Sequence, residues 1–293
     1  MSGYDILTAM ARRTRRIIFL LATMLFIGAS YVAIVYAQGY KYSLSENKFV
    51  YTGTISLKVS TDAKIFLNDK LHGSTSFIGN SYGIDRLLPG DYKVRLYREG
   101  FSSWEKTVSV KEGLRTDFPH ILILPTSEEE VAKIVSDIEL KFQQIFDNNA
   151  NNAPAATIST MPTPKVSPRA TGSPIPAVSA EPETRLFYIE NGNLYQTIDS
   201  KPMKIASNVE GFSVSDGNRK IAWWNTYVMW VMWLEDTDYQ PFHKKGDVEL
   251  ITRFAAPIER VAWFDAEDHI VVQSNGYKII EIDKRGGLNI IKL

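Results

Sequence analysis

An uncharged, apolar run near the N-terminus constrains this chain more than any other feature. The segment from Ile17 to Ala37 contains no Asp, Glu, Lys or Arg. At about 1.5 Å per residue, a helix of this length spans roughly 30 Å, the thickness of the hydrocarbon core of a bilayer. Because charge is costly to place in lipid, such a run predicts a transmembrane helix that contacts the bilayer along its length.

The flanking residues predict the orientation of that helix. Four arginines precede it, and positive charge favours the cytoplasmic side of a membrane. We therefore expect residues 1–16 in the cytoplasm and everything after Gln38 outside, as in a single-pass protein of the cell membrane. Aromatic side chains are expected near the outer interface. The arginines are Arg12, Arg13, Arg15 and Arg16, and the interfacial tyrosines are Tyr31, Tyr36, Tyr40 and Tyr42.

A cleaved signal peptide is the alternative interpretation of the same run. Val35-Tyr36-Ala37 is a tolerable cleavage site. Signal-peptide apolar cores are usually about 7–15 residues long, however, and this run is longer. No cysteine follows the run, which excludes a lipoprotein anchor. An uncleaved anchor fits the length better, and the bulk of the chain is exported under either interpretation.

The composition of the chain excludes several classes of function. The length of 293 residues is typical of about two domains. Lys+Arg equals Asp+Glu, so the basic surplus typical of nucleic-acid binders is missing and no nucleic-acid partner is expected. The absence of cysteine excludes disulfides, thiol catalysis and thiolate metal sites.

Residues 50–125 show the period-two alternation of half-buried strands. Ile55, Leu57 and Val59 share one face of "TISLKVS", and Tyr92, Val94 and Leu96 share one face of "DYKVRLY". In "WEKTVSV" the inward positions are less regular, and Trp104, Thr107 and Val110 are the residues expected inside. Short strands separated by turn residues such as Pro89-Gly90 predict a small antiparallel β-sandwich.

The stretch "LLPGDYKVRLYREGFSSWEKTVSV" resembles the PEGA domain, a short β-sandwich module of exported bacterial and archaeal proteins. The resemblance covers residues 53–124 and implies an envelope module with no catalytic residues. One segment departs from the family pattern: where Pro-Glu-Gly-Ala is expected, this chain has Ser60-Thr61-Asp62-Ala63. The matching residues are Leu88, Pro89, Gly90, Tyr92, Val94, Gly100, Phe101 and Trp104.

A helix and a linker are predicted next. Residues 127–147 read as an amphipathic helix that Ser127 caps, with Glu130 three residues on. Its apolar stripe can pack on a neighbouring domain or serve self-association. Residues 148–183 are rich in Pro, Ser, Thr, Ala and Asn, and have too few large apolar side chains to form a core, so they predict a disordered linker. The stripe consists of Val131, Ile134, Val135, Ile138, Phe142, Ile145 and Phe146.

Strands return in residues 184–293, where "KIAWWNTYVMWVMWLED" holds four of the chain's six tryptophans. After the turn near Asn225-Thr226, both faces of the following strand are apolar. A strand that is apolar on both faces is expected between two layers of structure. Core packing is therefore the favoured interpretation, while an aromatic ligand surface and membrane insertion remain alternatives. For "VELITRF" no pairing strand is evident.

The stretch from Ile258 to Asn289 is similar to the blades of WD40-like or TolB-type β-propellers. This resemblance implies a partial, propeller-like domain, because residues 184–293 can supply only two to three blades and closed propellers have about 4–8. The combination of a membrane anchor, a PEGA-like domain and such blades resembles membrane-anchored envelope proteins of bacteria. Open blade edges, like the helix, could support self-association.

The sequence offers no catalytic, cofactor-binding or metal-binding residues, and no cofactor is expected. The histidines His72, His120, His243 and His269 are scattered and lack metal-site spacing. Calcium ligands are conceivable in "LEDTDYQ", where the acidic residues are Glu235, Asp236 and Asp238, but the glycine and terminal glutamate of an EF-hand loop are missing. A solvated loop is the better interpretation.

The sequence thus predicts a mainly β protein: an N-terminal transmembrane helix, a PEGA-like sandwich, a helix, a linker and a propeller-like region. The expected function is non-catalytic binding or scaffolding outside the membrane, with an envelope glycan or a protein as partner. Two alternatives remain, an exported enzyme on a propeller-like platform and a sensor subunit that acts with a membrane partner.

Overall fold

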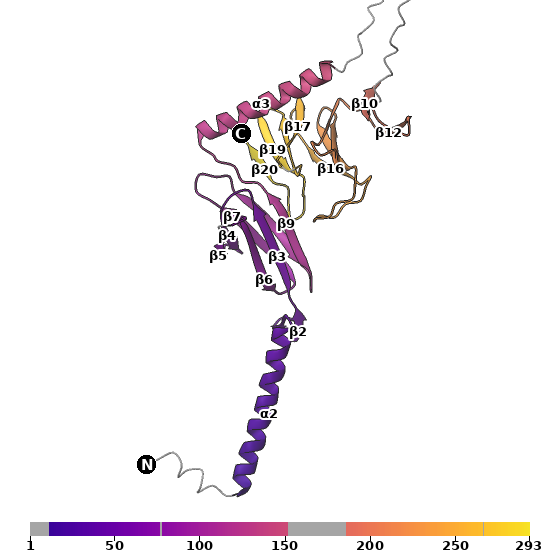
Figure 1. Cartoon of the computed structure of the whole chain (residues 1–293). Helices are drawn as coiled ribbons and strands as arrows, with labels where there is room; N and C mark the ends of the chain where they lie inside the picture. The colour runs from indigo at the N-terminus through magenta and orange to yellow at the C-terminus, as the bar shows by residue number, and fades with distance from the viewer. Residues whose placement is uncertain (1–11, 77, 152–185, 266) are drawn as a thin grey trace, which may run out of the picture. The chain divides into compact units, whose positions relative to one another are not determined.

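The computed structural model describes residues 12–76, 78–151, 186–265 and 267–293 (Figure 1). It is mainly β, with an N-terminal apolar helix, a second helix and a C-terminal region rich in sheets, and it contains no closed barrel among the described residues. The predicted linker, apart from residues 148–151, lies outside them, as do residues 1–11 of the predicted cytoplasmic segment. Two compact units are present. The first comprises Met1–Ile123 with Tyr239–Pro241 and Arg285–Gly287, and the second comprises Leu124–Asp238, Phe242–Lys284 and Leu288–Leu293.

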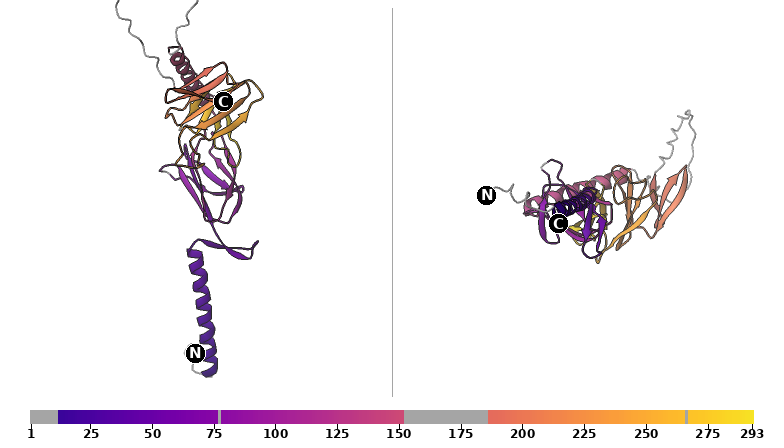
Figure 2. Two further views of the ribbon diagram at one scale, coloured as in Figure 1. Left: turned by 90° about the vertical axis from the view of Figure 1, so that its right-hand side faces the viewer. Right: turned by 90° about the horizontal axis from the view of Figure 1, so that it is seen from below.

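The first unit begins with helix α2, Arg12–Ala37, which includes the four arginines as well as the apolar run. None of its side chains is buried, and it is long and apolar enough to cross a membrane. A membrane anchor and a signal sequence both have these properties. A two-stranded hairpin follows, formed by β1 (Tyr40–Ser43) and β2 (Lys48–Tyr51), and it projects sideways from the end of α2 (Figure 2).

Two sheets then form the predicted sandwich. One has the order β6-β3-β9 and the other β5-β4-β7-β8. Their bounds are β3 Gly53–Val59, β4 Lys64–Leu67, β5 Lys70–Ser74, β6 Ser81–Leu87, β7 Gly90–Tyr97, β8 Trp104–Val110 and β9 Arg115–Ile121. One pair departs from the antiparallel prediction, because β3 and β9 run parallel. Alternating apolar residues indicate which face of a strand is buried, but they contain no information on the direction of its partner.

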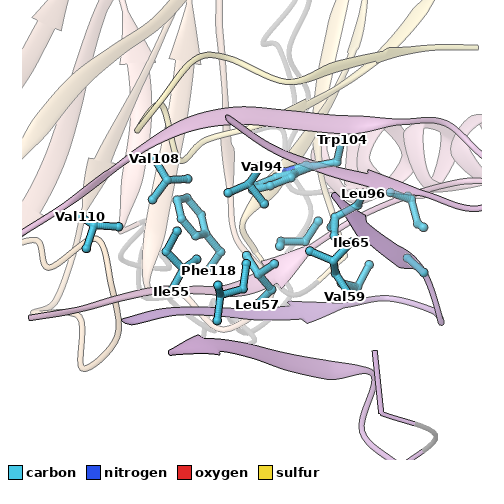
Figure 3. Close-up of a cluster of buried hydrophobic side chains, with 14 of the residues drawn as sticks. Ile55, Leu57, Val59, Ile65, Val94, Leu96, Trp104, Val108, Val110 and Phe118 are labelled. Atoms are coloured by element: carbon cyan, nitrogen blue, oxygen red, sulfur yellow. The ribbon is translucent and has the colours of Figure 1, made fainter. Parts of the chain in front are cut away.

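Side chains from both sheets fill the core of the sandwich (Figure 3). Ile55 and Leu57 on β3 are fully buried, as are Val94 and Leu96 on β7, which confirms the predicted inward faces. The rings of Trp104 and Phe118 meet edge to face, with centroids 5.4 Å apart. This core holds the inter-strand turns in place at each end of the sandwich.

Strand β8 corrects one sequence prediction. Its inward residues follow a strict period of two, and Thr107, expected inside, is exposed. Lys106 occupies the inward position between Trp104 and Val108, and it is only 1% exposed. Its amine lies 5.7 Å from the Trp104 ring centroid and 5.5 Å from that of Phe118. A lysine at an inward position concealed the alternation, because its apolar stem packs like a hydrophobic residue while its type predicts exposure.

The second unit begins with helix α3, Glu128–Asn151, which extends beyond the predicted end. The two predicted capping residues contact each other at its start, where Ser127 Oγ donates to Glu130 Oε2 at 2.8 Å. This is a bond between side chains, whereas a capping box bonds each side chain to a backbone N–H. Ile138 and Phe142 from the apolar stripe are buried, at 2% and 4% exposure. The stripe therefore packs within this unit, chiefly on strand β17.

Three antiparallel sheets follow in chain order, and each is an up-and-down meander. The first contains β10 (Phe187–Glu190), β11 (Asn193–Ile198) and β12 (Lys201–Ser207). The second contains β13 (Gly211–Val214), β14 (Lys220–Trp224), β15 (Val228–Trp233) and β16 (Val248–Arg253). The third contains β17 (Arg260–Phe264), β18 (His269–Gln273), β19 (Tyr277–Glu281) and β20 (Ile290–Lys292). The "VELITRF" segment, for which no partner was predicted, is β16 and pairs with β15 across a long loop.

The tryptophan-rich strands β14 and β15 lie in the middle layer. Ile221 and Trp223 pack into the core shared with the first sheet, while Ala222 and Trp224 pack into the core shared with the third. Along β15, Met232 joins the first of these cores, and Met229, Val231 and Trp233 join the second. Because both faces are covered, the prediction that these residues form core is confirmed.

Candidate functional site

An open cleft at one end of the β-sandwich, lined by several polar and charged residues, is the candidate site. Four inter-strand segments line it. They are the β3–β4 turn, the end of β5 with the residue after it, the residue before β6, and the end of β7 with the two residues after it. The cleft has a volume of about 620 Å³, and its lining residues are Asp62, Ala63, Lys64, Ser74, Thr75, Asn80, Tyr97, Arg98 and Glu99. Loops on a rigid β scaffold are a common place for binding groups.

Arg98, one of the lining residues of this cleft, contacts three other side chains. Its guanidinium pairs with the Asp62 carboxylate and donates to the Thr61 hydroxyl. It also lies 4.4 Å from the ring centroid of Phe101. These contacts restrict the rotation of Arg98, so the donors and acceptors around it have fixed positions.

The backbone around the cleft is also held in place. Ala63 N donates to Thr75 Oγ1 at 3.0 Å, and Thr75 N donates to Ala63 O at 3.0 Å. Asn80 O accepts from Val59 N at 3.0 Å, with the backbone of Asn80 in the left-handed region at φ 47°. Asparagine tolerates this conformation better than most residues. The cleft therefore combines a fixed backbone with exposed polar side chains.

The chemistry of the cleft suits a neutral, hydroxyl-rich ligand. Asp62 and Glu99 can accept hydrogen bonds, Lys64 and Arg98 can donate them, and Asn80 can do both. The Tyr97 side chain, 42% exposed, adds an amphipathic aromatic surface. Positive and negative groups are balanced, so the lining has no strong preference for an anion or a cation.

Sequence reasoning missed these residues because they are scattered over four segments that only the fold brings together. One signal was available. Thr61 and Asp62 lie in the segment that departs from the Pro-Glu-Gly-Ala pattern, and in the structure both are bonded to Arg98. The polar residues in this turn, together with the charged residues Arg98 and Glu99 after β7, were the available sequence signal for a binding site.

The other conceivable sites lie elsewhere. His72 Nδ1 is 3.0 Å from Tyr82 Oη, His120 is in β9, His243 stacks on Trp233 with centroids 3.6 Å apart, and His269 is buried in β18. The four histidines are therefore not brought together. Among the described residues, no group of three or more His, Cys, Asp or Glu side chains could hold a metal ion.

In the acidic stretch after β15, Glu235 and Asp236 form ion pairs. Asp236 Oδ2 lies 2.8 Å from Lys244 Nζ, and its hydrogen bonds with Lys244 and with Lys245 N lower the pKa of this carboxyl. Glu235 lies 3.7 Å from Arg219. Both acidic side chains are more than half exposed, as in a solvated loop.

Buried charges in the second unit join its second and third sheets. Lys220 Nζ donates to Asp268 Oδ1 at 2.7 Å and to Glu267 O at 2.8 Å, and Lys220 is 2% exposed. Arg219 Nε donates to Glu267 Oε2 at 3.0 Å. Sequence reasoning did not single out these residues. They form paired, structural contacts of the kind that fix one packing arrangement.

Comparison with known families supports the resemblance of the sandwich to the PEGA domain. Residues 54–120 match the family model of the PEGA domain. No curated protein matches the chain. The matched segment covers the sandwich strands β3 to β9, apart from Gly53 and Ile121 at their outer ends, and the whole cleft lining. It indicates an extracytoplasmic module for binding or scaffolding.

Proposed function

We propose that this protein is a single-pass membrane protein that presents a glycan-binding PEGA domain outside the cytoplasm. Helix α2 would act as the uncleaved anchor, with its arginine-rich end in the cytoplasm. The lipid-compatible surface of α2, from which no side chain is buried, supports this role. The usual extracellular location of PEGA domains also supports this role of α2.

The observation that carries the proposal is the cleft around Arg98. It is open, its positive and negative side chains are balanced, and an exposed tyrosine borders it. A sugar presents hydroxyl groups that both donate and accept, so a mixed lining of carboxylates, amide and guanidinium complements it. Tyr97 can cover the apolar face of a sugar ring while its hydroxyl stays in water.

The sheet-rich region is proposed to act as a non-catalytic scaffold of partial propeller type. Its three meanders have the up-and-down connectivity of propeller blades. Most tryptophans of this region are buried in its cores, which leaves few of them for a ligand surface. Protein partners are proposed to bind this region, and its open sheet edges are proposed to support self-association.

Binding to defined oligosaccharides tests the proposal. The full-length protein in lipid nanodiscs is titrated calorimetrically with N-acetylglucosamine oligomers, muropeptides and mannose oligomers. We expect saturable binding of one of these classes. Tyr97→Ala and Asn80→Ala should each weaken it by about tenfold, because one aromatic contact or one hydrogen bond contributes about 1 kcal/mol or somewhat more.

Tyr227→Ala is the matched control, because Tyr227 is 45% exposed and lies in the other unit. It should bind like the unchanged protein. The glycan proposal is abandoned if none of the three sugar classes binds, or if Tyr97→Ala and Tyr227→Ala have the same affinity.

A further inference from the structure

The hairpin that follows α2 has one face made entirely of aromatic residues. In its register Tyr40 faces Tyr51 and Tyr42 faces Phe49. Residues two apart on a strand point to the same side, so all four rings share one face. The ring centroids are 5.0 Å apart in the first pair and 5.4 Å apart in the second.

Part of this aromatic face is open, while Tyr40 and Phe49 are half-buried. Tyr42 is 47% exposed and Tyr51 is 40% exposed, and Leu44 in the turn is 84% exposed. On the opposite face, Ser43 and Val50 are each only 4% exposed. In water the reverse is expected, because a hairpin gains stability by covering its large apolar side chains.

The hairpin is closed at its base and contacts the β8–β9 turn of the sandwich. Thr52 N and Thr52 Oγ1 donate to Gly39 O, at 3.0 and 2.6 Å, which joins the end of the hairpin to its beginning. Tyr51 N donates to Glu112 Oε1 at 3.2 Å. A Cβ atom on Gly113 would lie 2.8 Å from the Tyr51 ring, so this ring packs against the β8–β9 turn.

We propose that this aromatic face lies in the membrane interface and binds the lipid surface beside α2. This inference rests on the proposed membrane anchor and adds a second, surface-lying contact to it. Only Gln38 and Gly39 separate α2 from β1, and the hairpin projects sideways from the end of the helix (Figure 2). Aromatic rings with a polar end favour the level of the lipid headgroups.

The lipid surface is the occupant that the position of the hairpin favours. An isolated two-stranded hairpin is marginally stable in water, so this one gains from a covering layer. Since α2 ends only two residues before β1, the bilayer is the surface that lies beside it. Charge has a smaller role than the aromatic rings, because Glu46 lies 2.7 Å from Lys48 and offsets one of the two lysines of the hairpin, Lys41 and Lys48.

Depth-dependent quenching tests the inference on the full-length protein in vesicles of phosphatidylethanolamine and phosphatidylglycerol. The chain has no cysteine, so one introduced thiol carries the only label. Ser45→Cys places a fluorophore in the hairpin turn, and Phe26→Cys places one on the helix. Ser103→Cys serves as the control, since it precedes β8 at the end opposite to Val110, whose side chain contacts Gly53 beside the hairpin.

We expect shallow nitroxide lipids to quench the label at residue 45, deep nitroxide lipids to quench the label at residue 26, and neither to quench the label at residue 103. Tyr42→Ser should remove most of the quenching at residue 45. Tyr227→Ser, which changes a tyrosine of similar exposure outside the hairpin and outside the cleft, should leave it unchanged.

The two proposals fail in different ways. If the label at residue 26 is quenched but the label at residue 45 is not, the interfacial hairpin is wrong and the anchor stands. If neither label is quenched, the membrane anchor itself is wrong. Quenching at residue 45 that persists in Tyr42→Ser would also overturn the assignment to the aromatic face.

Discussion

Arg260 Nη2 lies 2.9 Å from both carboxylate oxygens of Glu139, and this pair joins α3 to the first strand of the third sheet. The same guanidinium lies 4.5 Å from the ring centroid of Phe142 on α3. One arginine thus combines an ion pair with a stacked contact on the helix. The amphipathic helix predicted from the sequence has a specific partner in the sheets.

Arg260→Ala should destabilise the second unit by about 1–2 kcal/mol, because it removes both the ion pair and the stacked contact. Arg260→Lys should retain only part of the stability that Arg260→Ala loses, since an ammonium group cannot form the planar contacts of a guanidinium. Thermal unfolding followed by near-ultraviolet circular dichroism of the tryptophans measures the effect. Lys141→Ala, which removes a pair with the 80% exposed side chain of Asp216, is the control on the same helix and should change stability by less than about 0.5 kcal/mol.

Lys106→Ala should destabilise the β-sandwich by about 2–3 kcal/mol, because truncation leaves a cavity beside Trp104 and Phe118. Lys106→Met keeps most of the stem volume and should cost clearly less. Urea unfolding monitored by tryptophan fluorescence distinguishes the two variants. Equal losses would mean that the charge of Lys106, rather than the packing of its stem, stabilises the domain.

Gly53→Ala should also destabilise this domain. A Cβ atom there would lie 2.6 Å from Lys111 O and 2.9 Å from Leu114 O, and backbone atoms in a turn cannot move aside cheaply. Gly83→Ala is the matched control, since no atom lies nearer than 4.0 Å to its added methyl group. It should be neutral or stabilising by up to about 1 kcal/mol, because it restricts the unfolded chain. A Gly53→Ala protein as stable as the unchanged protein would show that the β8–β9 turn adapts.

The stack of His243 on Trp233 predicts a pH dependence. Burial lowers the pKa of His243 below its ordinary value of 6.5, although the nearby carboxylates of Glu249 and Asp247 oppose the shift. Since the unfolded chain then binds the proton more readily, the stability gained from the neutral ring is fully present above about pH 6.5 and is lost as the pH falls through the folded-state pKa.

His243→Gln removes this titration. The melting temperature of the unchanged protein should therefore fall more steeply than that of His243→Gln between about pH 7.5 and about pH 5.5. The difference should be small above pH 7, where the ring is neutral in both the folded and the unfolded state. Parallel pH curves for the two proteins would contradict a depressed pKa at His243.

Local patterns in the sequence determined much of this protein. The uncharged run predicts α2, the capping residues predict the start of α3, and alternating apolar residues predict the inward faces of β3 and β7. The two apolar faces of β15 correctly predict a strand between two layers. These features follow from residues a few positions apart, whose spacing alone decides which side of an element is buried.

Only the tertiary structure decided the features that depend on distant residues. The parallel pairing of β3 with β9, the pairing of β16 with β15 and the burial of Lys106 are examples. The cleft is another, because Asp62, Asn80 and Arg98 come from separate turns. The physical reason is the same in each case. Periodicity reports which face of a strand is buried, while partner, direction and the meeting of loops depend on contacts between segments far apart in the chain.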